Sequence, residues 1–145
     1  MADIKKILSK NKTIAMIGVS KDLTKPSTIV MKYMQKYGYK VIPVNPSAKG
    51  EKILGEEVFG TLEEIKKKID IVDVFRPSEE AVAIARDTVK IGAKVLWLQL
   101  GISSNEARNI VESNNIDYIE NRCTKMEYQK ISLKVTQAFP VLINR

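Results

Sequence analysis

The chain has 145 residues, of which 44% are hydrophobic and 28% charged, and its formal net charge is +7. This length allows one domain with a hydrophobic core, so we expect a single domain over residues 1–145, and no run approaches the roughly 18 apolar residues of a membrane span. The absence of histidine excludes Ser-His-Asp and Cys-His nucleophile systems, His-ligated zinc and phosphohistidine intermediates.

Along the chain, apolar runs alternate with helical patterns. The apolar runs are continuous instead of alternating with polar residues, which predicts buried parallel strands. Four clear runs are Thr13–Val19, Tyr39–Val44, Ile71–Phe75 and Lys94–Leu100, and two weaker ones lie near Glu57–Phe59 and Asp117–Glu120. The helix starts predicted between or after them, from proline at the first position, a Ser cap or a capping box, are Pro26, Thr61, Ser78, Ser103 and Thr124.

This order of elements predicts an α/β fold with a single doubly wound, mainly parallel sheet. In such sheets ligands bind at the carboxyl ends of the strands, where the strand order reverses. The residues just after each strand are therefore the candidates for a site.

The first of these turns, IGVSKDLTKPS (17–27), departs twice from the dinucleotide fingerprint G-x-G-x-x-G, at Ser20 and Leu23. It offers hydroxyl groups, lysines and the free N–H groups of the helix that begins at Pro26. We expect either an anion site built from these groups or an ordinary loop capped by Thr24 or Ser27.

The second strand ends in Val44-Asn45-Pro46, followed by Lys49. NAD enzymes place a carboxylate there to bind the ribose, so its absence favours a ribose that carries a phosphate, as in NADP or coenzyme A. After the next strand, Phe75 is either an adenine-binding side chain or part of the core. Arg76 is either a phosphate ligand or a solvated residue.

Two further residues stand out by their type. Asp73 lies inside an apolar run, so it is either a general base or, more commonly for such a residue, a hydrogen-bond partner of a neighbouring loop. Cys123 precedes the last helix and is either a small buried apolar residue or a reactive thiol. A single cysteine and the lack of an apolar leader segment predict a cytoplasmic protein.

Several segments, in this order and spacing, resemble the small stand-alone CoA-binding protein family, whose Rossmann-like domain is related to the N-terminal domain of the succinyl-CoA synthetase α subunit. They are IAMIGVSKDLTKPS, VMKYMQKYGYKVIPVNP, IDIVDVFRPSE, GAKVLWLQLGI and NRCTKME, within residues 10–131.

The resemblance implies which residues bind coenzyme A. The residues expected along the pyrophosphate are Gly18, Val19, Ser20, Lys25, Pro26 and Ser27. Those expected around the adenosine are Val44, Asn45, Pro46, Lys49 (for the 3′-phosphate), Phe75 and Arg76. Those expected along the pantetheine are Gln99, Gly101, Asn121, Arg122 and Cys123. Many members have histidine at the position of Tyr128, which weakens a catalytic interpretation here.

The resulting hypothesis is a cytoplasmic module that binds coenzyme A or an acyl-CoA, without a recognisable catalytic constellation or metal site. The alternatives are an NADP-dependent oxidoreductase, a redox protein that forms a mixed disulfide between Cys123 and coenzyme A, and an interaction module. The last would use the C-terminal AFPVLI for a homodimer or a protein partner. Neither a nucleic-acid motif nor a membrane segment is recognised.

Overall fold

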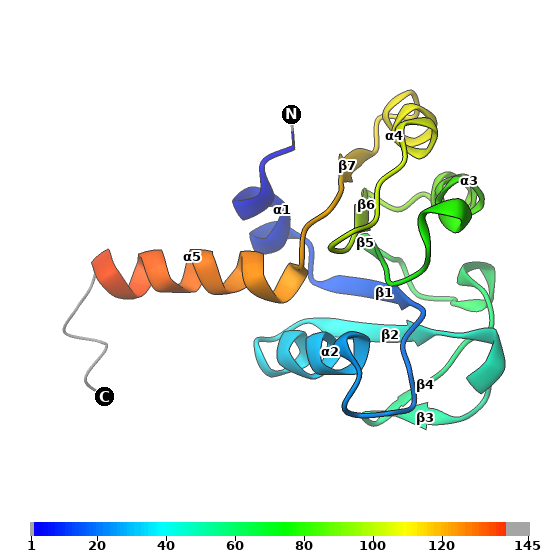
Figure 1. Ribbon diagram of the computed structural model, residues 1–145, viewed down its shortest axis with the longest axis horizontal. Helices are drawn as coiled ribbons and strands as arrows, with labels where there is room; N and C mark the ends of the chain where they lie inside the picture. The colour runs from blue at the N-terminus through cyan, green and yellow to red at the C-terminus, as the bar shows by residue number, and fades with distance from the viewer. Residues whose placement is uncertain (1, 139–145) are drawn as a thin grey trace.

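Five parallel strands form the central sheet of the protein (Figure 1). The computed structural model describes residues 2–138. The strand order is β2-β1-β5-β6-β7, so the direction of winding reverses between β1 and β5. The strands are β1 (Thr13–Ile17), β2 (Lys40–Val44), β5 (Ile71–Val74), β6 (Val95–Leu98) and β7 (Asp117–Ile119). The predicted α/β fold with a parallel sheet is confirmed.

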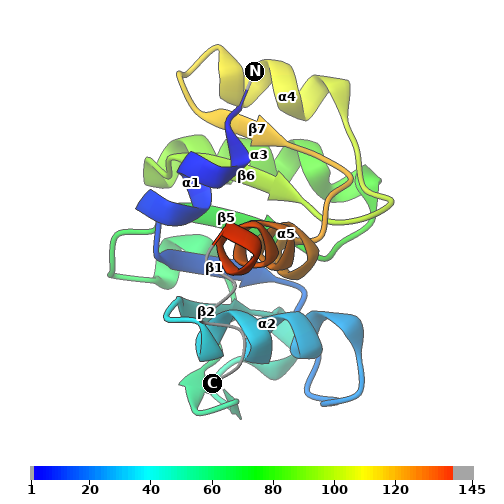
Figure 2. The same ribbon diagram turned by 90° about the vertical axis from the view of Figure 1, so that its left-hand side faces the viewer.

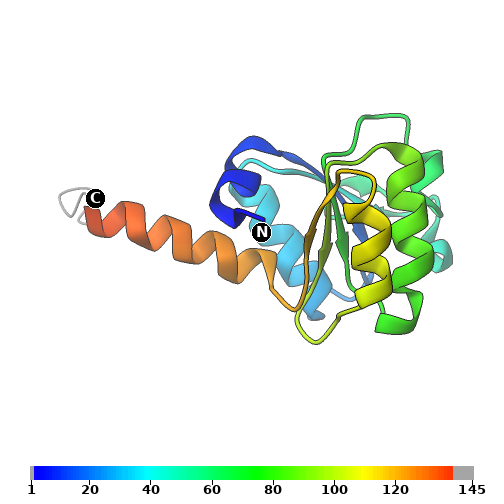
Figure 3. The same ribbon diagram turned by 90° about the horizontal axis from the view of Figure 1, so that it is seen from above.

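Helices cover both faces of the sheet and enclose two separate cores (Figure 3). One face is covered by α1 (Ile4–Lys10), α2 (Pro26–Lys36) and α5 (Thr124–Ala138), and the other by α3 (Ala81–Ile91) and α4 (Asn105–Glu112). Both cores use strand residues that are almost completely buried, which explains why the strands are mostly apolar.

Short elements complete the chain between β2 and α3. The strands β3 (Lys52–Ile53) and β4 (Glu56–Glu57) pair with each other in an antiparallel hairpin outside the main sheet. The weak strand predicted at Glu57–Phe59 joins the main sheet only through a single bridge from Phe59 to Val44. Three 3-10 helices are Pro46–Ala48, Leu62–Glu64 and Ser78–Glu80.

The helix starts follow the sequence signals only in part. Pro26 begins α2 as predicted. The capping box at Thr61 forms, but it begins only the short 3-10 helix, and α4 is capped by Ser104 instead of Ser103. Ser78 likewise begins a 3-10 turn, so that α3 itself starts at Ala81.

The helix α1 was not among the predicted elements. Asp3 caps it through a hydrogen bond from the Lys6 backbone, and Ile7 and Leu8 are buried. The helix α1 contacts α5, which lies between α1 and α2 (Figure 2) and continues beyond the sheet (Figure 1). Within residues 2–138 no helix is both long and apolar enough to cross a membrane. The C-terminal segment predicted as an interaction surface lies outside the described residues from Phe139 onward.

Candidate functional site

The carboxyl ends of β1 and β5 meet at the point where the sheet winding reverses. Gly18 follows β1 with a φ of +89°, a conformation that favours glycine. A Cβ atom at this position would lie 2.5 Å from the backbone oxygen of Phe75 and 2.9 Å from Cδ of Arg76. Glycine is thus required by both the turn and the close approach of the loop after β5.

Backbone hydrogen bonds hold the neighbouring strand ends in register. The N–H group of Gly18 donates to Val44 O, and that of Phe75 donates to Ile17 O, both at 2.8 Å. The side-chain amide of Asn45 donates to Val19 O at 2.8 Å, which fixes the first turn against the end of β2. The ends of β1, β2 and β5 therefore form one rigid rim.

A depression of about 380 Å³ opens on this rim. Five of the predicted site residues line it, namely Gly18, Val44, Asn45, Pro46 and Arg76. The remaining lining residues are Ile17, Ser47, Gly60, Thr61, Leu62, Glu80, Ile84 and Asp87. The structure thus brings the predicted ends of three strands together around one pocket.

The sequence reasoning missed the residues that close the pocket from above the sheet. Gly60, Thr61 and Leu62 follow the bridge between Phe59 and Val44, while Ile84 and Asp87 belong to α3. The capping box at Thr61 was a recognisable signal, but only the fold shows that this turn lies beside the end of β2.

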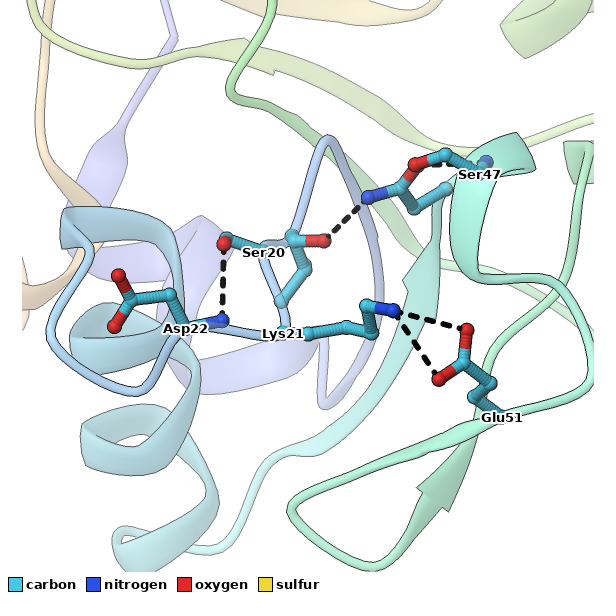
Figure 4. Close-up of polar contacts among 7 residues, drawn as sticks. Ser20, Lys21, Asp22, Ser47 and Glu51 are labelled. Carbon is cyan, nitrogen blue, oxygen red and sulfur yellow. Dashed lines mark hydrogen bonds and ion pairs between the residues drawn. The ribbon is translucent and has the colours of Figure 1, made fainter.

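The hydroxyl groups of the first turn are used mainly within the turn itself. The Ser27 hydroxyl accepts from the Ser20 N–H at 3.0 Å. The Ser20 hydroxyl accepts from the Asp22 N–H at 3.0 Å, as Figure 4 shows. Thr28 donates to the backbone oxygens of Ser20 and Asp22. Because Ser27 is buried, its hydroxyl shapes the turn and is not exposed to a ligand.

Asp22 stabilises the same turn through its carboxylate. Its Oδ1 accepts from both the N–H and the hydroxyl of Thr24, which lowers the pKa of Asp22. The N-cap of α2 is Lys25, without a side-chain cap, so neither Thr24 nor Ser27 caps the helix as the simpler alternative required. The helix start therefore has no side-chain cap, although Ser27 and Thr28 in its first turn are buried.

Three cationic side chains at this end of the sheet are each paired with a carboxylate. The ion pairs are Lys21–Glu51 (visible in Figure 4), Lys49–Glu64 and Arg76–Glu80. Such exposed pairs contribute little stability, so a phosphate can compete for the cation at small cost.

The Arg76–Glu80 pair is the one that lies in the pocket. Nη2 of Arg76 donates to Oε2 of Glu80 at 2.6 Å, and Nε donates to the same carboxylate at 3.1 Å. The hydrogen bonds from Arg76 lower the pKa of Glu80 and raise that of Arg76. Both groups are therefore charged at neutral pH, and Glu80 fixes the direction of the guanidinium.

Three other predicted ligand residues pack against or within the core instead. Phe75 packs against the core formed with α1, α2 and α5, and it does not line the pocket. Gln99 is 3% exposed, and its amide donates to Asp73 and to Thr124. Val19 is fully buried too, and only its backbone oxygen takes part in the rim.

Asp73 is fully buried at the centre of this hydrogen-bond network. One carboxylate oxygen accepts from Gln99 and the other from the Thr124 hydroxyl at 3.1 Å. Burial raises the pKa of Asp73 to about 7, although the hydrogen bonds oppose this shift. The network joins β5, the end of β6 and the start of α5, as expected for the structural alternative rather than for a general base open to substrate.

The residues predicted along the pantetheine form a second loop cluster. The N–H group of Gly101 donates to Oδ1 of Asn121 at 2.8 Å, and Trp97 Nε1 donates to the Arg122 backbone oxygen at 2.7 Å. Cys123 is half-buried against the core.

Asn121 and Arg122 line a different depression of about 430 Å³, together with Ala2, Ile4, Arg108, Tyr118, Ile119 and Glu120. This depression follows the edge strand β7, away from the reversal of the sheet winding. We therefore place the candidate site in the smaller pocket at the ends of β1, β2 and β5. Among residues 2–138, no three His, Cys, Asp or Glu side chains are arranged to hold a metal ion.

Comparison with known proteins extends these observations. A family model described as "CoA binding domain" matches residues 12–129. The uncharacterized protein YneT of Bacillus subtilis is 37% identical over 127 residues, which are 88% of this chain and 93% of YneT. The solved structure of cell-free ID.343 from Thermus thermophilus is 32% identical, with a TM-score of 0.84 over 89% of this chain and 98% of that one.

A longer relative is also similar. The ADP-forming acetate–CoA ligase of Methanocaldococcus jannaschii is 26% identical over 141 residues, which cover 92% of this chain but only 20% of the ligase. The chain thus corresponds to a small part of that enzyme.

Proposed function

Because the chain belongs to the CoA-binding domain family, we propose that it binds coenzyme A, free or acylated, at the carboxyl ends of β1, β2 and β5. The observation that carries this proposal is the pocket between Gly18, Asn45 and Arg76, at the reversal of the sheet winding. This is the position at which open α/β sheets bind their ligands.

The pocket has the composition that an adenosine requires. Apolar side chains of Val44, Leu62 and Ile84 provide a surface for the base, and they replace Phe75 in the role first expected of it. Asn45 and Ser47 offer polar groups at the end of β2, where NAD enzymes place a carboxylate. The absence of that carboxylate is compatible with a phosphorylated ribose.

The phosphate groups have two sources of attraction near this pocket. The start of α2 provides free N–H groups and the positive end of the helix dipole. Arg76 presents a planar guanidinium suited to a phosphate, and Lys25 stands beside the helix start. We propose that these groups hold the pyrophosphate, while the 3′-phosphate is held by Lys49.

In this proposal the protein acts as a binding module, and its function is to hold the coenzyme. The chain is similar to a small part of a ligase, and the reaction of that ligase is not transferred to it.

Isothermal titration calorimetry of the ligand-free protein tests the proposal. We expect coenzyme A to bind about tenfold or more tightly than NADP or NAD. This difference corresponds to about 1.4 kcal/mol or more of binding free energy. Tighter binding of NADP than of coenzyme A would instead support an oxidoreductase and reject the proposal. Acetyl-CoA, titrated in parallel, tells whether the acyl group alters the affinity.

A further inference from the structure

The three helices on one face of the sheet carry an unusually one-sided charge. α1 and α2 contain lysines but no acidic residue, and Glu127 is the sole acidic residue of α5. The lysines of these helices and of the turn after α1 that form no ion pair with a carboxylate of residues 2–138 are Lys5, Lys6, Lys10, Lys12, Lys32, Lys36 and Lys125.

The carboxylates close to this face do little to balance it. Glu127 is bound by Lys130 at 3.1 Å and lies 3.9 Å from Arg122, and its side chain is only 12% exposed. Asp3 is occupied as the cap of α1. By contrast, α3 and α4 on the other face mix acidic and basic residues.

A cluster of tyrosines lies between α2 and α5 on the lysine-bearing side. The ring centroids of Tyr33 and Tyr37 are 4.7 Å apart, and those of Tyr37 and Tyr128 are 5.2 Å apart. Tyr39 lies beneath them, 5.9 Å from Tyr128.

Three of the lysines stand over these rings. The Nζ–centroid distances are 4.4 Å for Lys12 over Tyr39, 5.6 Å for Lys36 over Tyr37, and 5.4 Å for Lys125 over Tyr33. We call this combination of Tyr33, Tyr37 and Tyr128 with Lys12, Lys36 and Lys125 the lysine–tyrosine face. Its tyrosines, Lys36 and Lys125 belong to α2, the C-cap of α2 and α5, and Lys12 lies in the turn after α1. The coenzyme pocket is instead lined by residues of α3, which covers the other face of the sheet.

We propose that the lysine–tyrosine face binds an acidic protein surface. Tyrosine is enriched at protein interfaces, whose rim is polar, and Tyr37, the C-cap residue of α2, is 39% exposed here. Complementary charge would speed the encounter and select the partner. A second copy of the chain is disfavoured, because two faces of like charge repel each other.

The composition of the face also favours protein over other polyanions. The helices α1, α2 and α5 contain no arginine, the residue that dominates bidentate contacts to phosphate and to bases. In the ligase relative, the similar segment is part of a much longer protein chain. A segment similar to this domain thus occurs there together with other protein segments.

Fluorescence anisotropy with a labelled synthetic peptide of glutamates interspersed with leucines tests the inference. The variant Lys12→Glu/Lys36→Glu reverses two charges of the face, and Lys66→Glu/Lys67→Glu makes the same change of net charge in the loop after the Leu62–Glu64 helix. We expect the first variant to lose about tenfold or more in affinity and the second less than about twofold, because only the first removes complementary charge. Tyr37→Ala should also weaken binding, while melting curves of all variants verify folding.

Several results would overturn the inference. Equal losses in both double variants would mean that the peptide responds only to net charge. Tighter binding of oligodeoxythymidylate or of phosphatidylserine vesicles would identify a different class of partner, and no binding of the peptide to the unsubstituted chain would reject the face altogether. A coenzyme A titration of the same variants distinguishes the two sites. Neither double variant alters the pocket, so the affinity for coenzyme A should be unchanged.

Discussion

At the scale of single residues, Arg76 is the side chain on which the coenzyme proposal depends most directly. Replacing Arg76 by alanine is expected to weaken coenzyme A binding by about 1–3 kcal/mol, because a charge-assisted hydrogen bond to phosphate is lost. Calorimetry measures the change. In the control Glu80→Gln, the guanidinium is released from its ion pair, so affinity should stay equal or rise. Unchanged affinity of Arg76→Ala would place the ligand elsewhere.

Gly18 provides a second test at this scale. Gly18→Ala forces a side chain into a φ of +89° and against the Phe75 oxygen. Gly55 is a matched control, because it has a φ of +84° but nothing within 4 Å of an added Cβ. The conformational strain alone costs on the order of 1–3 kcal/mol, so both variants should be less stable in urea denaturation. We expect Gly18→Ala to lose clearly more stability than Gly55→Ala. Equal losses of stability would show that the close approach of Gly18 to Phe75 is unimportant.

The sequence predicted the polar residues at the strand ends, but not what they contact. Asn45 and Arg76 were recognised because they follow predicted strands, and Gly18 because it begins the first turn; all three line the pocket. Gln99 also follows a strand, yet it turns inward to Asp73. The direction of such a side chain depends on which helix covers it, and that is set by contacts between residues far apart in the chain.

At the scale of elements, the Asp73 network predicts how stability depends on pH. The unfolded carboxyl has a pKa near 3.8, and the folded one about 7. Because the folded state favours the protonated form, the contribution of Asp73 to stability is highest at acidic pH. It falls as the pH rises from about 4 to 7, by on the order of 4 kcal/mol in total.

Urea denaturation at several pH values, with Asp73→Asn as the reference, measures this contribution. The difference in unfolding free energy between the two proteins should fall across that interval and then level off. The contributions of the other titrating groups are the same in both proteins and do not affect this difference. A difference that is constant from pH 4 to 8 would show that Asp73 keeps its charge in the folded protein.

The elements themselves followed from the sequence to different degrees. Buried strands were predicted because most of their residues are apolar, although the structure ends β1 at Ile17 since Gly18 turns the chain. The helix α1 was missed, even though Ile4, Ile7 and Leu8 repeat at helical spacing after the cap Asp3. Short helices bury so few residues that the fold, more than the local pattern, decides whether they form.

At the scale of the whole molecule, the net charge of +7 should affect how fast an anionic ligand arrives. The association rate of coenzyme A, measured by stopped flow, is expected to fall several-fold as salt is raised, because screening shortens the reach of the field to about 8 Å at physiological ionic strength. The dissociation rate should change much less. An association rate independent of salt would show that only the local groups of the pocket attract the ligand.

The position of α5 has a consequence for the synthesis of the protein. Its first residue, Thr124, supplies a hydrogen bond to Asp73 in the middle of the sheet, 51 residues earlier, and the helix packs between α1 and α2 from the beginning of the chain. During translation, Asp73 can make this hydrogen bond only after the start of α5 has left the ribosome. A nascent chain that stops before α5 leaves one core of the sheet partly uncovered, so we expect the sheet to complete its packing only once α5 has been synthesised.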